Sequence, residues 1–172
     1  ITSNLEEKID HISNYAITLS INSNIADVLK ENPTVPENTL EHFLVNSELT
    51  DQAQRIIGLH KNIYAWDILD TENHWFHSST TETDQLDSIL GSEILDSLQT
   101  NLAFQFLGPF QISGEPTFVA LKSITNIDNT KYLGALVLLI RETNISSAFR
   151  DLPDSSSRDF YITDENGQIL SS

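Results

Sequence analysis

The segment with the most chemically reactive side chains is residues 67–77, where two histidines lie near two aspartates. His74 and His77 follow Asp67 and Asp70 along the chain. Imidazole and carboxylate groups are both zinc ligands, and the chain has no cysteine to supply a thiolate. Side chains three positions apart on a strand point to opposite faces, so the two imidazoles cannot share an ion without a bulge. We therefore predict no metal site and interpret both histidines as surface residues.

A serine nucleophile is the other chemistry that this segment could support. Ser78 and Ser79 follow His77, which could act as a base. No G-x-S-x-G turn surrounds them, and the six glycines form no phosphate-cradling or dinucleotide-binding pattern. We therefore predict no catalytic residues and no cofactor, and we do not expect this chain itself to be an enzyme.

The composition excludes several classes of partner. The 172 residues include 9 lysines and arginines against 25 aspartates and glutamates, which gives a formal net charge of -16. Such a charge repels phosphate backbones and anionic lipid headgroups, so we predict no nucleic-acid partner. The longest apolar run, residues 133–140, is far shorter than the ~20 residues that span a bilayer. The chain has no methionine, and we interpret it as a fragment excised from a longer protein.

Two helical regions are expected before the first strand. Residues 1–30 carry apolar side chains at alternating spacings of four and three, which predicts one long amphipathic helix that ends before Pro33. Residues 36–59 show a similar periodicity. The apolar stripe on the first helix either packs on a sheet or forms a coiled-coil-like homodimer seam, and the pattern fits both. The members of this stripe are Leu5, Ile9, Ile12, Ala16 and Leu19.

Five strands and one helix are expected after this helical region. Runs rich in β-branched and aromatic residues alternate with polar turns, which is typical of antiparallel strands. Residues 132–140 are apolar at nearly every position, so this strand is expected at the centre of the sheet. The predicted fold class is α+β, with a long N-terminal helix packed on a five-stranded antiparallel sheet. The predicted strands are residues 62–70, 74–79, 102–112, 117–125 and 132–140, with a helix at residues 84–99.

The end of the chain is expected to begin a second module. A short helix at residues 144–152 leads into residues 153–157, the only stretch with the composition of a linker. Residues 159–163 and 168–172 then predict a hairpin. We divide the chain into a helical region at residues 1–60, a sheet domain at residues 61–150, and a linker with the opening hairpin of a second module at residues 151–172.

Five segments resemble parts of a known family. Four of them resemble, in chain order, the strands of extracellular Cache (PAS-like) sensor modules: IYAWDILDTENHWFHSS (residues 63–79), FLGPFQISGEPTFVALKSI (106–124), YLGALVLLIRETNISSAF (132–149) and RDFYITDENGQILSS (158–172). The last of these resembles the entry into a membrane-proximal second Cache module. The helical segment ISNYAITLSINSNIADVLKEN (12–32) is similar to the segment that follows the first membrane span in YesM-type sensor histidine kinases of Gram-positive bacteria.

The resemblance implies an extracellular ligand-sensing domain, anchored in the bacterial membrane through segments outside this fragment. It implies that the full-length protein is a sensor histidine kinase of a two-component system. The alternatives are the ectodomain of a chemoreceptor or a diguanylate cyclase, and a protein-interaction or dimerisation module without a small-molecule ligand. The amino-acid-binding subset of the family has an arginine before the third strand, whereas residues 100–104 contain none. We therefore expect an unknown small molecule rather than an amino acid.

The ligand pocket is expected on the sheet face that the first helix does not cover. That face, roofed by the helix at residues 84–99, can tolerate polar side chains that orient a ligand. Asp67 and Lys122 are charged residues on otherwise apolar strands, so each is paired, at a wet pocket edge, or at a solvated strand end. The aromatic candidates either form pocket walls or belong to the ordinary core. The candidate ligand-binding residues are Tyr64, Trp66, Asp67, Phe104, Phe106 and Lys122.

Overall fold

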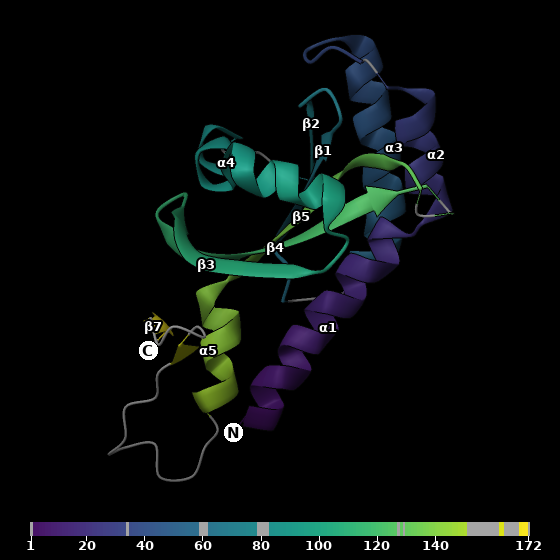
Figure 1. Ribbon diagram of the computed structural model, residues 1–172. Coiled ribbons are helices and arrows are strands. Elements are labelled where there is room, and N and C mark those ends of the chain that lie inside the picture. Colours follow the sequence, from purple (N-terminus) through teal and green to yellow (C-terminus); the bar gives the residue numbers. More distant parts are fainter. Residues whose placement is uncertain are drawn as a thin grey trace.

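The computed structural model describes residues 2–33, 35–58, 62–78, 83–126, 128, 130–150, 162–163 and 169–171. Three helices precede the sheet (Figure 1): α1 (Thr2–Ser20), α2 (Ser23–Glu31) and α3 (Leu40–Ile57). The elements that follow in chain order are β1 (Ala65–Asp70), β2 (Trp75–His77), α4 (Thr83–Thr100), β3 (Gln105–Ile112), β4 (Glu115–Thr125), β5 (Tyr132–Arg141), α5 (Glu142–Arg150), β6 (Ile162–Thr163) and β7 (Ile169–Ser171).

Strands β1 to β5 form one antiparallel sheet in the order β2-β1-β5-β4-β3. β5 lies at the centre, paired with β1 on one side and with β4 on the other. Residues 133–140 of this strand are all buried, as expected for a strand that is covered on both faces. The predicted α+β fold, with helices on a five-stranded antiparallel sheet, is therefore confirmed.

The three N-terminal helices cover one face of the sheet (Figure 1). Ile12, Ala16 and Leu19 of α1 are fully buried there, in one apolar core with residues of β1, β4 and β5. Leu5 packs partly against the same core, and Ile9 is half-buried. The buried part of the apolar stripe on α1 therefore packs on the sheet, which was one of the two possibilities that the sequence left open. Those three side chains are not free to form a homodimer seam.

The first helix differs from the prediction of one helix over residues 1–30. The chain turns at Ile21, and Asn22 begins a new helix, α2. The side-chain oxygen of Asn22 accepts the backbone N–H groups of Asn24 at 3.0 Å and of Ile25 at 3.1 Å. An asparagine side chain that takes these N–H groups favours the start of a helix over the continuation of one, so the apolar periodicity alone predicted the wrong boundary.

Two further helices also differ from the prediction. α3 begins at Leu40 rather than at residue 36, because the Thr39 hydroxyl accepts the backbone N–H of His42 and caps the helix there. α4 is kinked at Gly91, whose φ of 47° lies in the left-handed region that glycine adopts without a steric penalty. The helix predicted as continuous over residues 84–99 is therefore two helical segments.

α4 covers the opposite face of the sheet (Figure 1). Its Leu86, Leu90 and Leu98 are fully buried in a second apolar core with residues of β1, β4 and β5. The sheet thus separates two cores, one beneath the N-terminal helices and one beneath α4. A polar side chain on either face must find a partner or lie near an edge, because an unpaired polar group in such surroundings is destabilising.

The end of the chain is described only in part. α5 follows β5 directly, and its Asn144 carbonyl and Ser147 hydroxyl both accept from the ammonium of Lys8 on α1. β6 and β7 pair in antiparallel fashion, which agrees with the predicted hairpin. The predicted linker at residues 153–157 lies outside the described residues, and the second module stays a prediction. Among the described helices, none has the length and apolar character that a membrane crossing requires.

Candidate functional site at the edge strand of the sheet

The six candidate ligand-binding residues do not lie together. Asp67 lies on the sheet face beneath α4, between Ala65 and Leu69, which both belong to the α4-side core. Trp66, the neighbour of Asp67 on β1, is buried in the core beneath the N-terminal helices. Strand alternation therefore places these two candidates on opposite sides of the sheet.

Phe104, Phe106 and Lys122 lie on the side of the N-terminal helices. The two phenylalanine rings pack against that core and stack on each other with their centroids 6.3 Å apart. The ammonium of Lys122 donates to the carbonyl oxygen of Leu102, and partial burial lowers the pKa of that ammonium. These three residues thus line the edge of the helix-side core and do not face the pocket expected beneath α4.

Tyr64 lies just before β1, at one end of the sheet. Its hydroxyl is 3.5 Å from Oγ1 of Thr117, and the guanidinium carbon of Arg141 lies 5.0 Å from the centroid of its ring. The second contact is a cation–π interaction at a partly exposed position. Among the six candidates, Asp67 is therefore the one that the structure places on the expected face.

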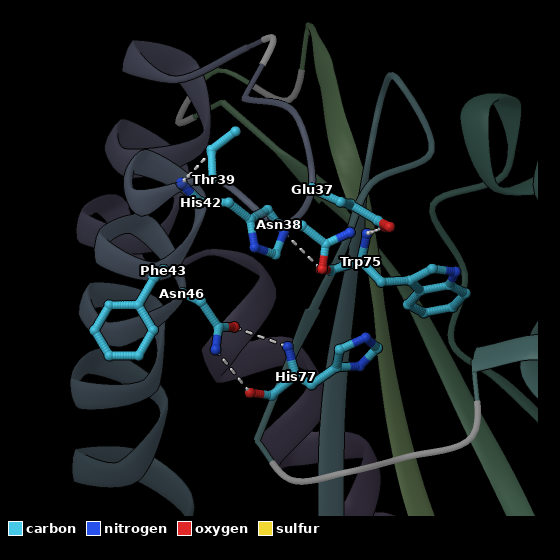
Figure 2. A pocket seen from close by; sticks show the side chains of 8 residues that line it. All are labelled: Glu37, Asn38, Thr39, His42, Phe43, Asn46, Trp75 and His77. Carbon is cyan, nitrogen blue, oxygen red and sulfur yellow. Dashed lines mark hydrogen bonds between the residues drawn. The ribbon is translucent and has the colours of Figure 1, made fainter.

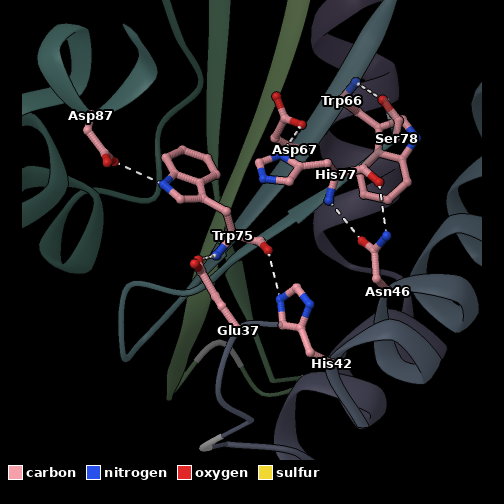
Figure 3. Close-up of polar contacts among 9 residues, drawn as sticks. All are labelled: Glu37, His42, Asn46, Trp66, Asp67, Trp75, His77, Ser78 and Asp87. Carbon is pink, nitrogen blue, oxygen red and sulfur yellow. Dashed lines mark hydrogen bonds and ion pairs between the residues drawn. The ribbon is translucent and has the colours of Figure 1, made fainter. Parts of the chain in front are cut away.

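Asp67 is completely buried, with 0% of its side chain exposed. His77 of β2 lies opposite Asp67 in the strand register, and its Nδ1 is 2.8 Å from Oδ1 of the carboxylate (Figure 3). The imidazole keeps 25% of its side chain exposed. A carboxylate removed from water is strongly destabilising unless a hydrogen-bonded partner accompanies it. The contact with His77 is therefore part of what makes the burial of Asp67 tolerable.

Trp75 extends this network toward α4. Its indole stacks on the imidazole of His77, with ring centroids 5.9 Å apart and an interplanar angle of 16°. The indole N–H donates to Oδ1 of Asp87 at 2.9 Å (Figure 3). The side chains of β2 therefore connect the buried carboxylate on β1 with the helix that roofs this face.

The second histidine of the segment also binds a carboxylate. Nδ1 of His74 is 3.1 Å from Oδ2 of Asp70, and Oδ1 of Asp70 accepts the backbone N–H groups of Glu72 and His74, each at 2.8 Å. The interpretation of both histidines as plain surface residues was wrong, because each is half-buried and hydrogen-bonded to an aspartate. Within the described part of the chain, no group of three or more potential metal ligands is present.

The pKa of Tyr132 is raised, and this predicts a loss of stability at alkaline pH. Burial, together with the nearby charge of Asp70, raises the pKa of the Tyr132 hydroxyl to about 12. The folded state therefore holds this proton more tightly than the unfolded chain, whose tyrosine titrates near 10. The resulting stability is complete below about pH 10 and is lost as the pH rises toward about 12.

Tyr132→Phe removes the ionisable hydroxyl and keeps the ring. Its free energy of unfolding, measured with urea at several values between about pH 9 and about pH 12, is expected to fall less steeply with pH than that of the wild type. Equal slopes for the two proteins would contradict the assignment of this pH dependence to Tyr132.

A groove of about 420 Å³ lies between α3, the loop before it and the edge strand β2 (Figure 2). Figure 2 shows the side chains of Trp75 and His77 directed away from α3, so these residues present their backbone to the groove. The volume lies within the range of small-ligand pockets, about 300–1,000 Å³. The residues that line the groove are Glu37, Asn38, Thr39, His42, Phe43, Asn46, Trp75 and His77.

None of the six sequence-based candidates lines this groove. His42 and Asn46 occupy positions that, in the sequence, look like the polar side of an amphipathic helix. Their partners lie on β2, and Asn46 is 31 residues away from His77 in the chain. The one available signal is Phe43, which belongs to the same apolar periodicity as Leu40 and Leu44 and does not by itself indicate a groove.

Comparisons with solved structures show a similar fold. The chain matches the ligand-binding domain of the Campylobacter jejuni chemoreceptor Tlp3 in complex with L-valine with a TM-score of 0.62 at 13% identity. The sensory domain of the same receptor with isoleucine bound gives a TM-score of 0.62 at 13% identity, and the complex with L-norvaline gives 0.52 at 14% identity. Each match covers 98% of this chain. No protein-family model and no curated protein matches the chain.

The chain spans 65% of the length of the L-valine complex, 64% of the isoleucine complex and 70% of the L-norvaline complex. At 13–14% identity, such a likeness establishes the fold. The five-stranded antiparallel sheet with helices on both faces is therefore of the PAS-like, Cache type that the sequence resemblance implied.

Proposed function

We propose that the chain is an extracellular sensory domain of a bacterial transmembrane receptor and that it binds a small molecule. The observation that carries this proposal is the agreement in fold, over 98% of the chain, with chemoreceptor domains whose structures hold L-valine and isoleucine. The strongly acidic composition, which disfavours nucleic acid and anionic surfaces, supports a soluble ligand. Binding would shift the population of conformations that the receptor adopts.

Asp67 is the residue that we propose for ligand recognition on the face beneath α4. Its carboxylate is buried and oriented by His77, and Trp75 and Asp87 extend the same polar network to the roofing helix. A polar group held in a fixed direction within an apolar face suits the recognition of a specific ligand atom. Lys122 and the aromatic candidates on the helix side are not supported by this geometry.

The output of the receptor is a separate proposal. The resemblance of the helical segment at residues 12–32 supports a sensor histidine kinase, whereas the solved structures of similar fold belong to a chemoreceptor. An autophosphorylation assay of the full-length protein with labelled ATP separates these candidates. Phosphate incorporated on a histidine supports the kinase, and an absence of labelling favours the chemoreceptor.

Ligand binding is expected to stabilise the domain against heat. A ligand present at one hundred times its Kd stabilises the folded state by about 2.7 kcal/mol, which raises the Tm of a chain of this size by several degrees. The measurement is a thermal melt against a panel of small metabolites that includes L-valine, L-isoleucine and L-norvaline. We expect at least one compound to raise the Tm in proportion to the logarithm of its concentration.

Two variants test the role of Asp67. Asp67→Asn keeps an oxygen for the contact with His77 but removes the charge, and it is expected to abolish the ligand-induced rise in Tm. Lys122→Met removes the other charged candidate, on the opposite face, and is expected to retain the rise. A rise retained by Asp67→Asn would show that the ligand binds elsewhere. No rise with any compound would favour an interaction module without a small-molecule ligand.

A further inference from the structure

We propose that the N-terminal half of α4 is a hinged lid over the small-molecule site at Asp67. The lid comprises residues 83–90 and swings about Gly91, while the C-terminal half, residues 92–100, stays fixed to the sheet. The hydrogen bond between Trp75 and Asp87 is the latch that holds the lid shut. The purpose of the lid rests on the proposed function, because it controls access to that site, but the motion itself can be tested without a ligand.

The carboxylate of Asp67 cannot be reached from solvent while the lid is shut. Its side chain is 0% exposed, and its neighbours on β1, Ala65 and Leu69, lie in the same apolar core as Leu86 and Leu90 of the lid. Both of these leucines are fully buried as well. A ligand can therefore contact the carboxylate only when part of its covering moves.

Gly91 is suited to act as the hinge. Its φ of 47° and ψ of 164° interrupt the helix in a backbone conformation that glycine adopts far more readily than residues with a Cβ. The residue is exposed, and a Cβ placed on it would meet nothing within 4 Å. Surrounding side chains therefore do not restrict rotation of the backbone at this point, and hinge motions are absorbed at a few such positions.

The fixed half of α4 is bound to the middle of the sheet. The hydroxyl of Ser123 on β4 donates to the carbonyl oxygen of Leu98 at 2.5 Å and lies 3.3 Å from that of Asn101. Ser123 is buried, so this contact is protected from water. Nε2 of Gln105, the first residue of β3, donates to Oγ of Ser97 at 3.3 Å. A motion of this half would break a buried contact and displace the start of β3.

The polar contacts of the lid lie nearer the surface. The indole N–H of Trp75 donates to Oδ1 of Asp87 at 2.9 Å, and Asp87 is an exposed residue (Figure 3). Oε1 of Gln85 accepts the backbone N–H of Ser113 at 2.9 Å, in the exposed turn between β3 and β4. Water can replace either bond at a small net cost once the lid swings out. The lid is therefore the half that opens first.

The open state is a minor one, because opening transfers Leu86 and Leu90 from the core to water. Exposure of two buried leucines limits the open state to about one molecule in a thousand. Ligands can select a conformation that is populated at this level. A ligand that needs the open lid then binds with an apparent affinity that is lowered by the fraction of closed molecules.

The absence of cysteine from the chain allows the lid to be tested with a single introduced thiol. Leu86→Cys places the thiol beneath the lid, and Leu98→Cys places it beneath the fixed half, at two positions that are equally buried. The readout is the rate of reaction with dithiobis(nitrobenzoate) in native buffer. Each rate is divided by the rate that global unfolding alone would allow, as calculated from urea unfolding of the same variant. We expect a ratio of about ten or more for Leu86→Cys and of about one for Leu98→Cys.

Hydrogen exchange of the unsubstituted chain gives a second measurement, which does not depend on the folding of the cysteine variants. Amides of residues 88–90 are expected to exchange by local opening, at a rate that depends weakly on urea. Amides of residues 96–98 are expected to exchange at least about tenfold more slowly, because the fixed half opens less readily.

The latch is tested by substitutions in the background of each cysteine variant. Asp87→Ala removes the acceptor for the indole and is expected to raise the rate at Leu86→Cys about fivefold, the equivalent of one hydrogen bond. It is expected to leave the rate ratio of Leu98→Cys unchanged. Asp87→Asn keeps an oxygen acceptor and is expected to restore the slow rate. Asp96→Ala, the same change at an exposed position of the fixed half, is the matched control and is expected to alter neither ratio.

Three outcomes would overturn the proposal. Ratios near one at both thiols, together with equal hydrogen exchange in the two halves, would show that α4 opens only when the whole domain unfolds. A higher ratio for Leu98→Cys than for Leu86→Cys would place the motion in the other half. An equal effect of Asp87→Ala on both ratios would show that Asp87 stabilises the helix without acting as a latch. No ligand takes part in these measurements, so a thermal melt that detects no ligand would count against the proposed function and would leave their results unchanged.

Discussion

His77→Ala is expected to lower the free energy of unfolding by about 3 kcal/mol, because it removes the imidazole from a fully buried carboxylate. The backbone of residue 77 keeps its two bonds to Asn46 in this variant, so the loss of stability reports the imidazole alone, chiefly its contact with Asp67. The stacking of the ring on Trp75 is lost as well, which adds to the effect. The measurement is urea unfolding near neutral pH, followed by circular dichroism.

His74→Ala is the matched control, because it removes the equivalent imidazole from the other aspartate of the same hairpin. The carboxylate of Asp70 keeps the backbone N–H groups of Glu72 and of residue 74. The free energy of unfolding is therefore expected to fall by about 1 kcal/mol or less, which is the contribution of one ordinary hydrogen bond. Equal losses in the two variants would contradict the argument that Asp67 depends on its histidine.

Gly134→Ala is expected to destabilise the domain by about 3 kcal/mol or more, or to prevent folding altogether. A Cβ on Gly134 would lie 2.5 Å from the carbonyl oxygen of Leu69, which is a backbone atom of β1, the strand paired with β5. No side-chain rotation relieves this contact, so the two strands would have to move apart at the centre of the sheet. Urea unfolding measures the loss, and a protein recovered only in insoluble form agrees with the expectation.

Gly91→Ala provides the comparison. Gly91 has a φ of +47°, yet a Cβ there would meet nothing within 4 Å. Its substitution is expected to lower the free energy of unfolding by about 1 kcal/mol, from the left-handed backbone conformation alone. A Gly134→Ala protein that is as stable as Gly91→Ala would show that β1 and β5 are not packed as closely as the structure indicates.

The fold could be predicted from the sequence because its signals are local. Runs rich in β-branched and aromatic residues between polar turns identified all five strands, and the continuous apolar character of β5 identified its central place. The helix boundaries were predicted less well. Asn22 and Thr39 start helices through single side-chain bonds, which the apolar periodicity does not register.

The candidate site could be predicted only in part, because it depends on which elements become neighbours. Strand alternation alone places Trp66 and Asp67 on opposite faces of the sheet. Whether Lys122 lies on the same face as Asp67 is known only once β4 is paired in register with β5. The contact of Asn46 with His77 joins a helix to a strand 31 residues later in the chain. A single sequence contains no signal for such a contact, since a polar residue on a helix is usually solvated.

Trp75 and His77 of β2 make contacts on two sides of the strand. The backbone of Trp75 and His77 contacts the side chains of α3 and the preceding loop, while their rings contact Asp87 and Asp67. A change in one set of contacts can therefore reach the other set through these two residues. Suppose that a molecule loosens the contacts with α3 and thereby changes the ligand affinity of the site proposed beneath α4 by some factor. Thermodynamic reciprocity then requires that the ligand change the affinity for that molecule by the same factor.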